Sequence, residues 1–144
     1  MGKKVNFEFQ KGLEKKRILS FSGGRSLIKQ ELQAAKADLE EAVNRLENNK
    51  FKYATIMAYY SMFHSARALI YAKNYREKSH YYLLVAIKAL YVEEGLLEED
   101  MLNEFHSSMI LREDADYHSD FSQEGAESTV SSAKKFLEKV KKLV

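Results

Sequence analysis

Apolar residues recur at helical spacing along most of the chain after residue 26. In residues 28–46 they lie three and four positions apart, with charged side chains on the opposite face. Similar patterns predict a helix from about residue 79 to 95, another from about 98 into the segment 111–118, and a last one after residue 122. Ser79 and Ser122 stand where N-caps are expected, and Gly95 stands where the third helix should end.

The segment 52–73 differs from the others because apolar or small residues occur almost all around its predicted helix. A helix without a polar face is one surrounded by neighbours, so this segment is expected to be the central helix. Short links between long amphipathic helices favour an all-α fold, an antiparallel up-and-down bundle of four to five helices. The absence of proline agrees with this fold, and no segment shows the alternation of a strand.

The chain divides into a basic segment, residues 1–25, and a helical bundle, residues 26–144. The first segment carries seven basic and two acidic residues and ends in a serine and two glycines, a natural hinge. A flexible solvated tail is the simpler interpretation of this segment. The alternative is a basic arm that contacts phosphate groups.

Composition narrows the class of protein. A chain of 144 residues with 45% hydrophobic and 31% charged residues is typical of one soluble domain, and its net charge of +2 does not by itself indicate a nucleic-acid partner. The lack of cysteine excludes disulfides and thiolate metal sites. Without a signal peptide or a long apolar run, a cytoplasmic protein without membrane contact is expected. The four histidines lack ligand spacing, so no metal and no cofactor are expected.

The helix that begins near residue 98 has charged residues on its own apolar stripe. The stripe runs through residues 101/102, 105 and 108/109, and its next positions are Arg112 and Asp116. Charges at inward-facing positions are costly unless they are paired or used. The two side chains lie about 40° apart around a helix, close enough to pair. A structural pair is therefore one interpretation, with Tyr117 filling a gap and His118 at the surface.

The other interpretation is a catalytic site. Arginine offers a planar fork suited to phosphate, and histidine exchanges protons near neutral pH, so Arg112 and His118 together suit cleavage of a phosphodiester without a metal. His118 lies about 120° around the helix from Arg112, so one regular helix does not aim both at one point. Either the helix ends near Tyr117, or a two-fold dimer brings groups of both chains together.

Three segments resemble the HEPN family, specifically its small stand-alone prokaryotic type, and the resemblance covers nearly all of residues 26–144. They are AYYSMFHSARAL at 58–69, REKSH at 76–80 and LREDADY at 111–117. The resemblance implies a helical bundle that forms a homodimer. In many members it also implies a metal-independent endoribonuclease whose arginine and histidine lie four to six residues apart at a cleft between protomers. Many such members are toxins paired with a minimal nucleotidyltransferase antitoxin.

By this resemblance, Arg112 and His118 are the candidate catalytic residues, separated by five others, and Asp116 and Tyr117 support them. The chain departs from the best-defined toxins, in which four residues intervene: here Tyr117 stands where their histidine falls. The Arg-x-x-Ala-Asp-Tyr form resembles a sub-group without a fixed histidine. The implied function is an RNA-binding toxin that cleaves RNA. The alternative is a non-catalytic module that dimerises and binds a nucleotidyltransferase or a nucleotide.

The remaining histidines receive weaker assignments. His64 is expected to be a hydrogen-bonded core or interface group. His80, beside the expected cap Ser79, suits phosphate binding at a helix N-terminus, although an exposed first-turn histidine is the simpler expectation. His106 is expected in solvent.

Overall fold

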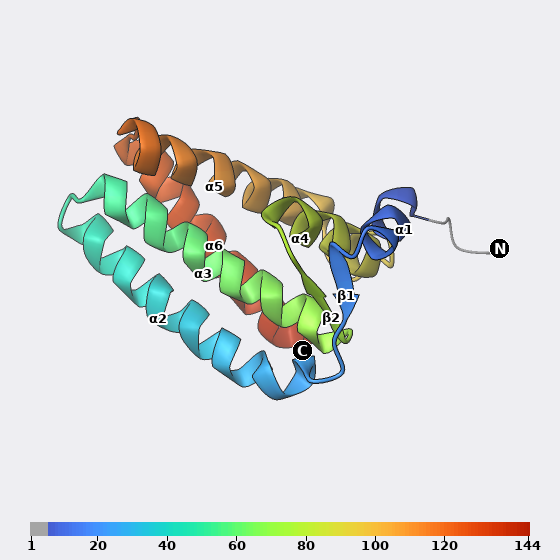
Figure 1. The fold of residues 1–144 in the computed structure, drawn as a ribbon. Coiled ribbons are helices and arrows are strands. Elements are labelled where there is room, and N and C mark those ends of the chain that lie inside the picture. The colour runs from blue at the N-terminus through green and yellow to red at the C-terminus, as the bar shows by residue number, and fades with distance from the viewer. Residues whose placement is uncertain (1–5) are drawn as a thin grey trace.

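The computed structural model describes residues 6–144, and four long helices form its main body (Figure 1). Residues 1–5, including the basic Lys3 and Lys4 of the N-terminal segment, lie outside the described part. In chain order the elements are α1 (Phe7–Glu14), β1 (Ile18–Ser20), the 3₁₀ turn η1 (Gly24–Leu27), α2 (Ile28–Glu47), α3 (Phe51–Ala72), β2 (Tyr75–Glu77), α4 (His80–Ile87), the π-helical turn η2 (Lys88–Val92), α5 (Glu99–His118) and α6 (Gln123–Leu143). The expected all-α bundle is confirmed.

Helix α3 is the central helix, as its lack of a polar face predicts. It packs against α2, α5 and α6, and its small residues, among them Ala58 and Ala66, are fully buried. Small side chains let neighbouring helices approach closely, so α3 can hold three of them at once. Large buried side chains, including Tyr59, Phe105 and Phe136, fill the space between α3, α5 and α6.

The helix ends follow local capping chemistry. The hydroxyl oxygen of Ser79 accepts a hydrogen bond from the backbone N–H of Tyr82, and that of Ser122 accepts one from Gly125. Both serines have extended backbone angles, as N-caps do. Gly95, with φ of +75°, follows η2 in the left-handed region that favours glycine. The caps expected at Ser79 and Ser122 are therefore confirmed.

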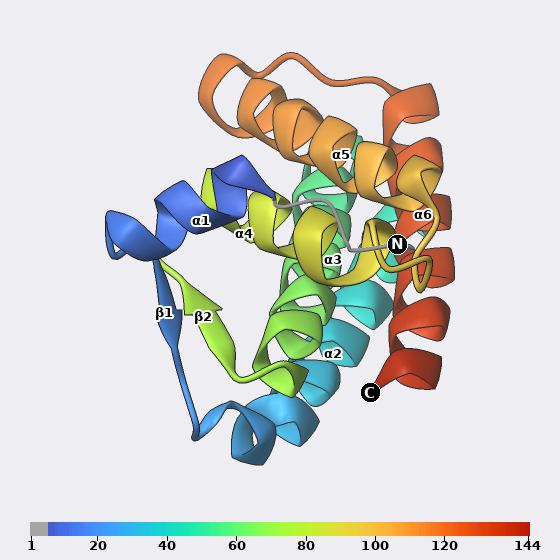
Figure 2. The same ribbon diagram turned by 90° about the vertical axis from the view of Figure 1, so that its right-hand side faces the viewer.

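The N-terminal segment is structured where it is described, contrary to the expectation of a flexible tail. Figure 2 shows α1 beside α4, and β1 pairs antiparallel with β2, Ile18 opposite Glu77 and Ser20 opposite Tyr75. The expectation that the chain has no strand was thus wrong for these two short strands. Each has three residues, too few for an alternating pattern, and each exists only because the other lies beside it.

This ribbon ties the start of the chain to the bundle. Ile18 is almost fully buried, and the rings of Phe9 and Tyr75 pack nearly perpendicular to each other with 5.3 Å between their centroids. Because β2 ends three residues before α4 begins, the ribbon also fixes where α4 starts. Within residues 6–144, no helix combines the length and the apolar character that a membrane span requires.

Candidate active site

Arg112 lies on the inward face of α5, with only 6% of its surface exposed. The buried stripe of this helix runs through Phe105, Met109, Arg112 and Ala115. It therefore includes Arg112, as expected, but continues to Ala115 and leaves the Asp116 side chain 42% exposed. The sequence pattern correctly predicted that Arg112 is buried. It was wrong for Asp116, because the buried stripe continues at the preceding residue, Ala115.

Three tyrosine rings surround the buried guanidinium. Its central carbon lies 5.0 Å from the centre of the Tyr59 ring, 5.9 Å from that of Tyr60 and 5.7 Å from that of Tyr117. Two of these rings come from α3 and the third from the last turn of α5. The negative faces of aromatic rings attract cations, so this cage holds the charge of Arg112 without a close carboxylate.

The charge of Arg112 is only weakly neutralised. A terminal guanidinium nitrogen stands 4.0 Å from the Asp116 carboxylate, beyond hydrogen-bonding distance, and the buried Nε has no hydrogen-bond partner among the described residues. Burial works against the charged form, but interactions with the Tyr117 hydroxyl and the other phenols outweigh it and raise the pKa of Arg112. The side chain is therefore a fixed cation with spare hydrogen-bonding capacity.

His80 lies beside this cage, which the sequence did not reveal. Its Nδ1 is 2.6 Å from the hydroxyl oxygen of Tyr59, and the two rings stack with 5.9 Å between centroids. The ring is half-buried rather than fully exposed. Burial and, to a lesser extent, the charge of Arg112 lower the pKa of His80, while Glu113 acts weakly in the opposite direction. The sequence offered two signals for His80: the serine cap that places it in the first turn of α4, and its position in the segment 76–80 that resembles the HEPN family.

His118 is the last residue of α5 and is exposed. Ser119 follows in the left-handed conformation, so the helix ends one residue later than the position that the sequence suggested. Within residues 6–144, no hydrogen bond, ion pair or ring contact joins His118 to Arg112. The fold thus brings Arg112, Tyr117 and, at longer range, Asp116 together within one chain, and leaves His118 apart from them.

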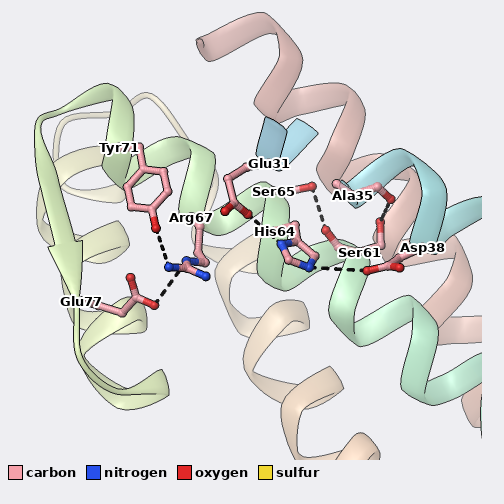
Figure 3. Close-up of polar contacts among 9 residues, drawn as sticks. All are labelled: Glu31, Ala35, Asp38, Ser61, His64, Ser65, Arg67, Tyr71 and Glu77. Carbon is pink, nitrogen blue, oxygen red and sulfur yellow. Dashed lines mark hydrogen bonds and ion pairs between the residues drawn. The ribbon is translucent and has the colours of Figure 1, made fainter. Parts of the chain in front are cut away.

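A second polar cluster connects α2, α3 and β2 (Figure 3). His64 is half-buried, and its Nδ1 is 2.7 Å from a carboxylate oxygen of Glu31, which agrees with the expected hydrogen-bonded histidine. Its Nε2 is 3.6 Å from the Asp38 carboxylate. Burial raises the pKa of Asp38, and the neighbouring imidazole lowers it to a smaller extent. His64 therefore bridges two carboxylates of α2 from the central helix.

The other half of this cluster is centred on Arg67. Its guanidinium donates a hydrogen bond to the Tyr71 hydroxyl and lies 3.7 Å from a carboxylate oxygen of Glu77, as Figure 3 shows. The second carboxylate oxygen of Glu77 is buried without a hydrogen-bond partner among the described residues. Burial raises the pKa of Glu77, against the opposing effects of its backbone hydrogen bond and Arg67. These contacts fasten β2 to α3 and are structural in character.

The described residues offer no obvious metal site. In residues 6–144, no three histidine, aspartate or glutamate side chains are placed to hold one ion together. The polar groups around Arg112 are instead a cation, phenols and an imidazole. That set is suited to binding an anion.

Comparisons with known proteins agree with this architecture. The family model of the HEPN domain matches residues 28–143. A protein of Methanocaldococcus jannaschii named "Putative toxin MJ0605" is 36% identical over 120 residues, which cover 80% of this chain and 90% of that protein. A second protein of the same organism, named "Putative toxin MJ0142", is 26% identical over 113 residues, 77% of each chain. Because the family match spans the whole bundle, from the start of α2 to the end of α6, this chain belongs to the HEPN domain family.

Proposed function

We propose that this HEPN protein is a metal-independent endoribonuclease that acts as the toxin of a toxin–antitoxin pair. The observation that carries the proposal is the state of Arg112. Among residues 6–144, its buried Nε has no hydrogen-bond partner, and the carboxylate nearest to its guanidinium is 4.0 Å away. A buried charge is costly unless it is neutralised or used, and a phosphodiester would supply the missing negative charge through the bidentate geometry that arginine favours.

In this mechanism Arg112 binds the scissile phosphate and stabilises the charge that grows on its non-bridging oxygens. The 2′ oxygen of the preceding ribose forms a bond to phosphorus while the bond from phosphorus to the 5′ oxygen breaks. His118 acts as general acid or base. In the base role it takes the proton of the 2′-hydroxyl, and water protonates the departing 5′ oxygen. The products are a 2′,3′-cyclic phosphate and a 5′-hydroxyl. Asp116 orients Arg112 or the groups of a second chain.

A homodimer is part of the proposal because His118 does not contact Arg112 within one chain. Large apolar side chains are exposed near the end of α5: Tyr117 is 70% exposed, Phe121 47% and Ile110 51%. Such a cluster favours contact with another protein surface. A second copy across a two-fold axis would cover these side chains and place its own His118 near the Arg112 cage.

The proposal also includes an antitoxin as the partner of this protein. Both similar proteins carry the word toxin in their names, and a toxin needs an antitoxin to be tolerated by its cell. We expect a minimal nucleotidyltransferase in this role. Co-expression with such a protein encoded in a neighbouring reading frame should relieve growth inhibition by this chain.

The test uses purified protein, RNA and a metal chelator. Wild type should cleave RNA in the chelator and leave 2′,3′-cyclic phosphate ends, and Arg112→Lys should lower the rate by about a hundredfold because lysine lacks the planar fork. His118→Ala should also be strongly impaired. Arg45→Lys is the matched control, because Arg45 is a partly exposed arginine paired with Glu41 on α2. No cleavage by wild type would contradict the proposal, and so would equal cleavage by wild type and both site variants.

One observation favours the second candidate, a non-catalytic module that dimerises and binds a nucleotidyltransferase or a nucleotide. The arginine cage of one chain lacks the histidine that catalysis requires, since His118 lies apart from it. This alternative expects that wild type cuts no RNA and that Arg112→Ala weakens the dimer. Light scattering after size-exclusion chromatography measures the second effect.

A further inference from the structure

Three side chains from three helices meet at the start of α4. Tyr59 comes from α3, His80 is the first residue of α4, and Arg112 comes from α5. The Tyr59 hydroxyl contacts His80 Nδ1 at 2.6 Å, while the guanidinium of Arg112 lies over the ring of the same tyrosine. Tyr59 therefore connects the buried cation to the histidine.

The contact with Tyr59 is compatible with two tautomers of His80, and the charge of Arg112 favours the one with its proton on Nε2. Tyr59 is fully buried, and burial keeps its pKa well above the ordinary value, so the phenol stays protonated. The positive guanidinium favours an orientation in which the phenol oxygen faces Arg112 and the O–H bond points away, toward Nδ1. The phenol then donates to Nδ1. A neutral imidazole that accepts at Nδ1 must carry its proton on Nε2.

Nε2 is consequently an N–H donor without an internal partner. Among residues 6–144 it makes no hydrogen bond, and it is not a buried atom. It stands at the N-terminus of an eight-residue helix, where first-turn N–H groups lack partners within the helix. Ser79 Oγ caps only the N–H of Tyr82 there. The positive end of α4 adds to the charge of Arg112 in attracting an anion.

We propose that Arg112, the Nε2–H of His80 and the first turn of α4 together bind one phosphate group, and that in the RNA reaction His80 contacts the scissile phosphate as a neutral hydrogen-bond donor. This inference rests on the proposed function for the source of the phosphate, an RNA phosphodiester. It gives His80 a role distinct from that of His118: His80 donates a hydrogen bond to a non-bridging oxygen and exchanges no proton. A neutral imidazole can stabilise developing negative charge in this way.

One charged group near His80 opposes anion binding. Glu113, exposed on α5, lies close enough to affect the pKa values of Tyr59 and His80. Its carboxylate repels a phosphate, so Glu113→Gln should tighten binding severalfold.

The test measures binding of an RNA oligonucleotide with 2′-O-methyl groups throughout, which cannot be cleaved because its 2′ oxygen has no free hydroxyl. Fluorescence anisotropy gives the dissociation constant. His80→Ala should weaken binding about tenfold to a hundredfold, as expected for a lost hydrogen bond to a charged group. His106→Ala is the matched control, an exposed histidine on α5, and should bind as wild type does.

Two further variants separate binding from a merely structural role. Glutamine is long enough to place its amide near the position of Nε2, whereas asparagine reaches only the position of Nδ1. His80→Gln should therefore bind nearly as tightly as wild type, and His80→Asn should bind as weakly as His80→Ala although it keeps a partner for Tyr59. Thermal unfolding of each variant shows that it is folded. Binding by His80→Asn that equals or exceeds that of His80→Gln would overturn the inference.

The outcomes also separate this inference from the proposed function. If wild type cleaves RNA while His80→Ala binds the oligonucleotide as tightly as wild type, the His80 site is wrong and the ribonuclease stands. If binding depends on His80 but RNA is never cut, the phosphate site stands and the ribonuclease is wrong. AMP is the second probe: AMP that binds more tightly than the oligonucleotide, with the same dependence on His80, would overturn the assignment to RNA.

Discussion

Arg112 and Asp116 are one helical turn apart on α5, yet their charged groups remain 4.0 Å apart because the carboxylate faces solvent while the guanidinium lies under three tyrosine rings. The rings, rather than the carboxylate, hold the arginine in place. Asp116→Asn should therefore change the free energy of unfolding by less than about 1 kcal/mol. Urea denaturation at neutral pH measures this, and a loss above about 2 kcal/mol would show that the ion pair is a main support of the site.

Arg112 should add little to the stability of the fold, because the cost of burying its charge and its favourable contacts with the three phenols oppose each other. A buried charge that is poorly neutralised can be replaced by an apolar side chain of similar length without loss. Arg112→Met should unfold at the same or a higher urea concentration than wild type while losing RNA cleavage. A variant that is strongly destabilised would instead indicate that Arg112 is structural, in favour of the non-catalytic module.

Gly24 is required where η1 crosses the end of α3. A Cβ atom at Gly24 would stand 2.7 Å from the backbone oxygen of Tyr71, and backbone cannot move aside as a side-chain tip can. Gly24→Ala should therefore destabilise the protein by about 1–3 kcal/mol. The adjacent Gly23 is the matched control: its nearest neighbour is the ring of Phe21 at 3.4 Å, and Gly23→Ala should change stability by less than about 0.5 kcal/mol. Equal effects of both substitutions would contradict this account of η1.

Glu77 should make the folded state less stable as pH rises. Its pKa is raised in the folded protein, chiefly by burial, so the folded state retains a proton that the unfolded state has released. The stabilisation from that proton is complete below the unfolded pKa of about 4.5 and is lost as pH rises through the folded pKa. The difference in unfolding free energy between Glu77→Gln and wild type should thus shift in favour of the variant as pH rises from about 4 to about 7, a window that begins near the ordinary pKa of a glutamate.

Glu98 should affect the stability of the folded state with the opposite pH dependence. Its pKa is lowered, first by a backbone hydrogen bond and then by Lys139, so its contribution is present above the unfolded pKa and is lost as pH falls. The free energy of unfolding of Glu98→Gln should accordingly fall relative to that of wild type as pH rises over the same window. A shift in favour of Glu98→Gln with rising pH would contradict the assignment for Glu98, and a shift against Glu77→Gln would contradict that for Glu77.

Local patterns predicted the parts of the fold that local physics determines. The periodic seams located α2, α5 and α6, the lack of a polar face located α3, and the serines at 79 and 122 marked two helix starts. The broken stripe of α5 identified Arg112 as a buried charge. Each of these features depends on residues within a few turns of one another, which is why one sequence sufficed.

Features that depend on distant partners were not predictable in this way. His80 belongs to the candidate site because Tyr59, on a different helix, reaches its Nδ1, and nothing near His80 in the sequence indicates that contact. The link between Arg67 and Glu77 likewise joins α3 to a strand that the pattern did not predict. The role of His118 stays a prediction, since it concerns a second chain.

The ribbon of β1 and β2 has a consequence for the order of folding. Helices α2 and α3 are neighbours in sequence and pack along their length, so they can associate soon after both have formed. Strand β1 leaves the ribosome before either helix, yet its partner β2 follows both of them. Pairing of Ile18 with Glu77 must therefore close the long loop that contains the α2–α3 hairpin. The start of α4, with His80, and the arginine cage, whose Arg112 lies on the still later helix α5, are accordingly both expected to assemble after the α2–α3 hairpin.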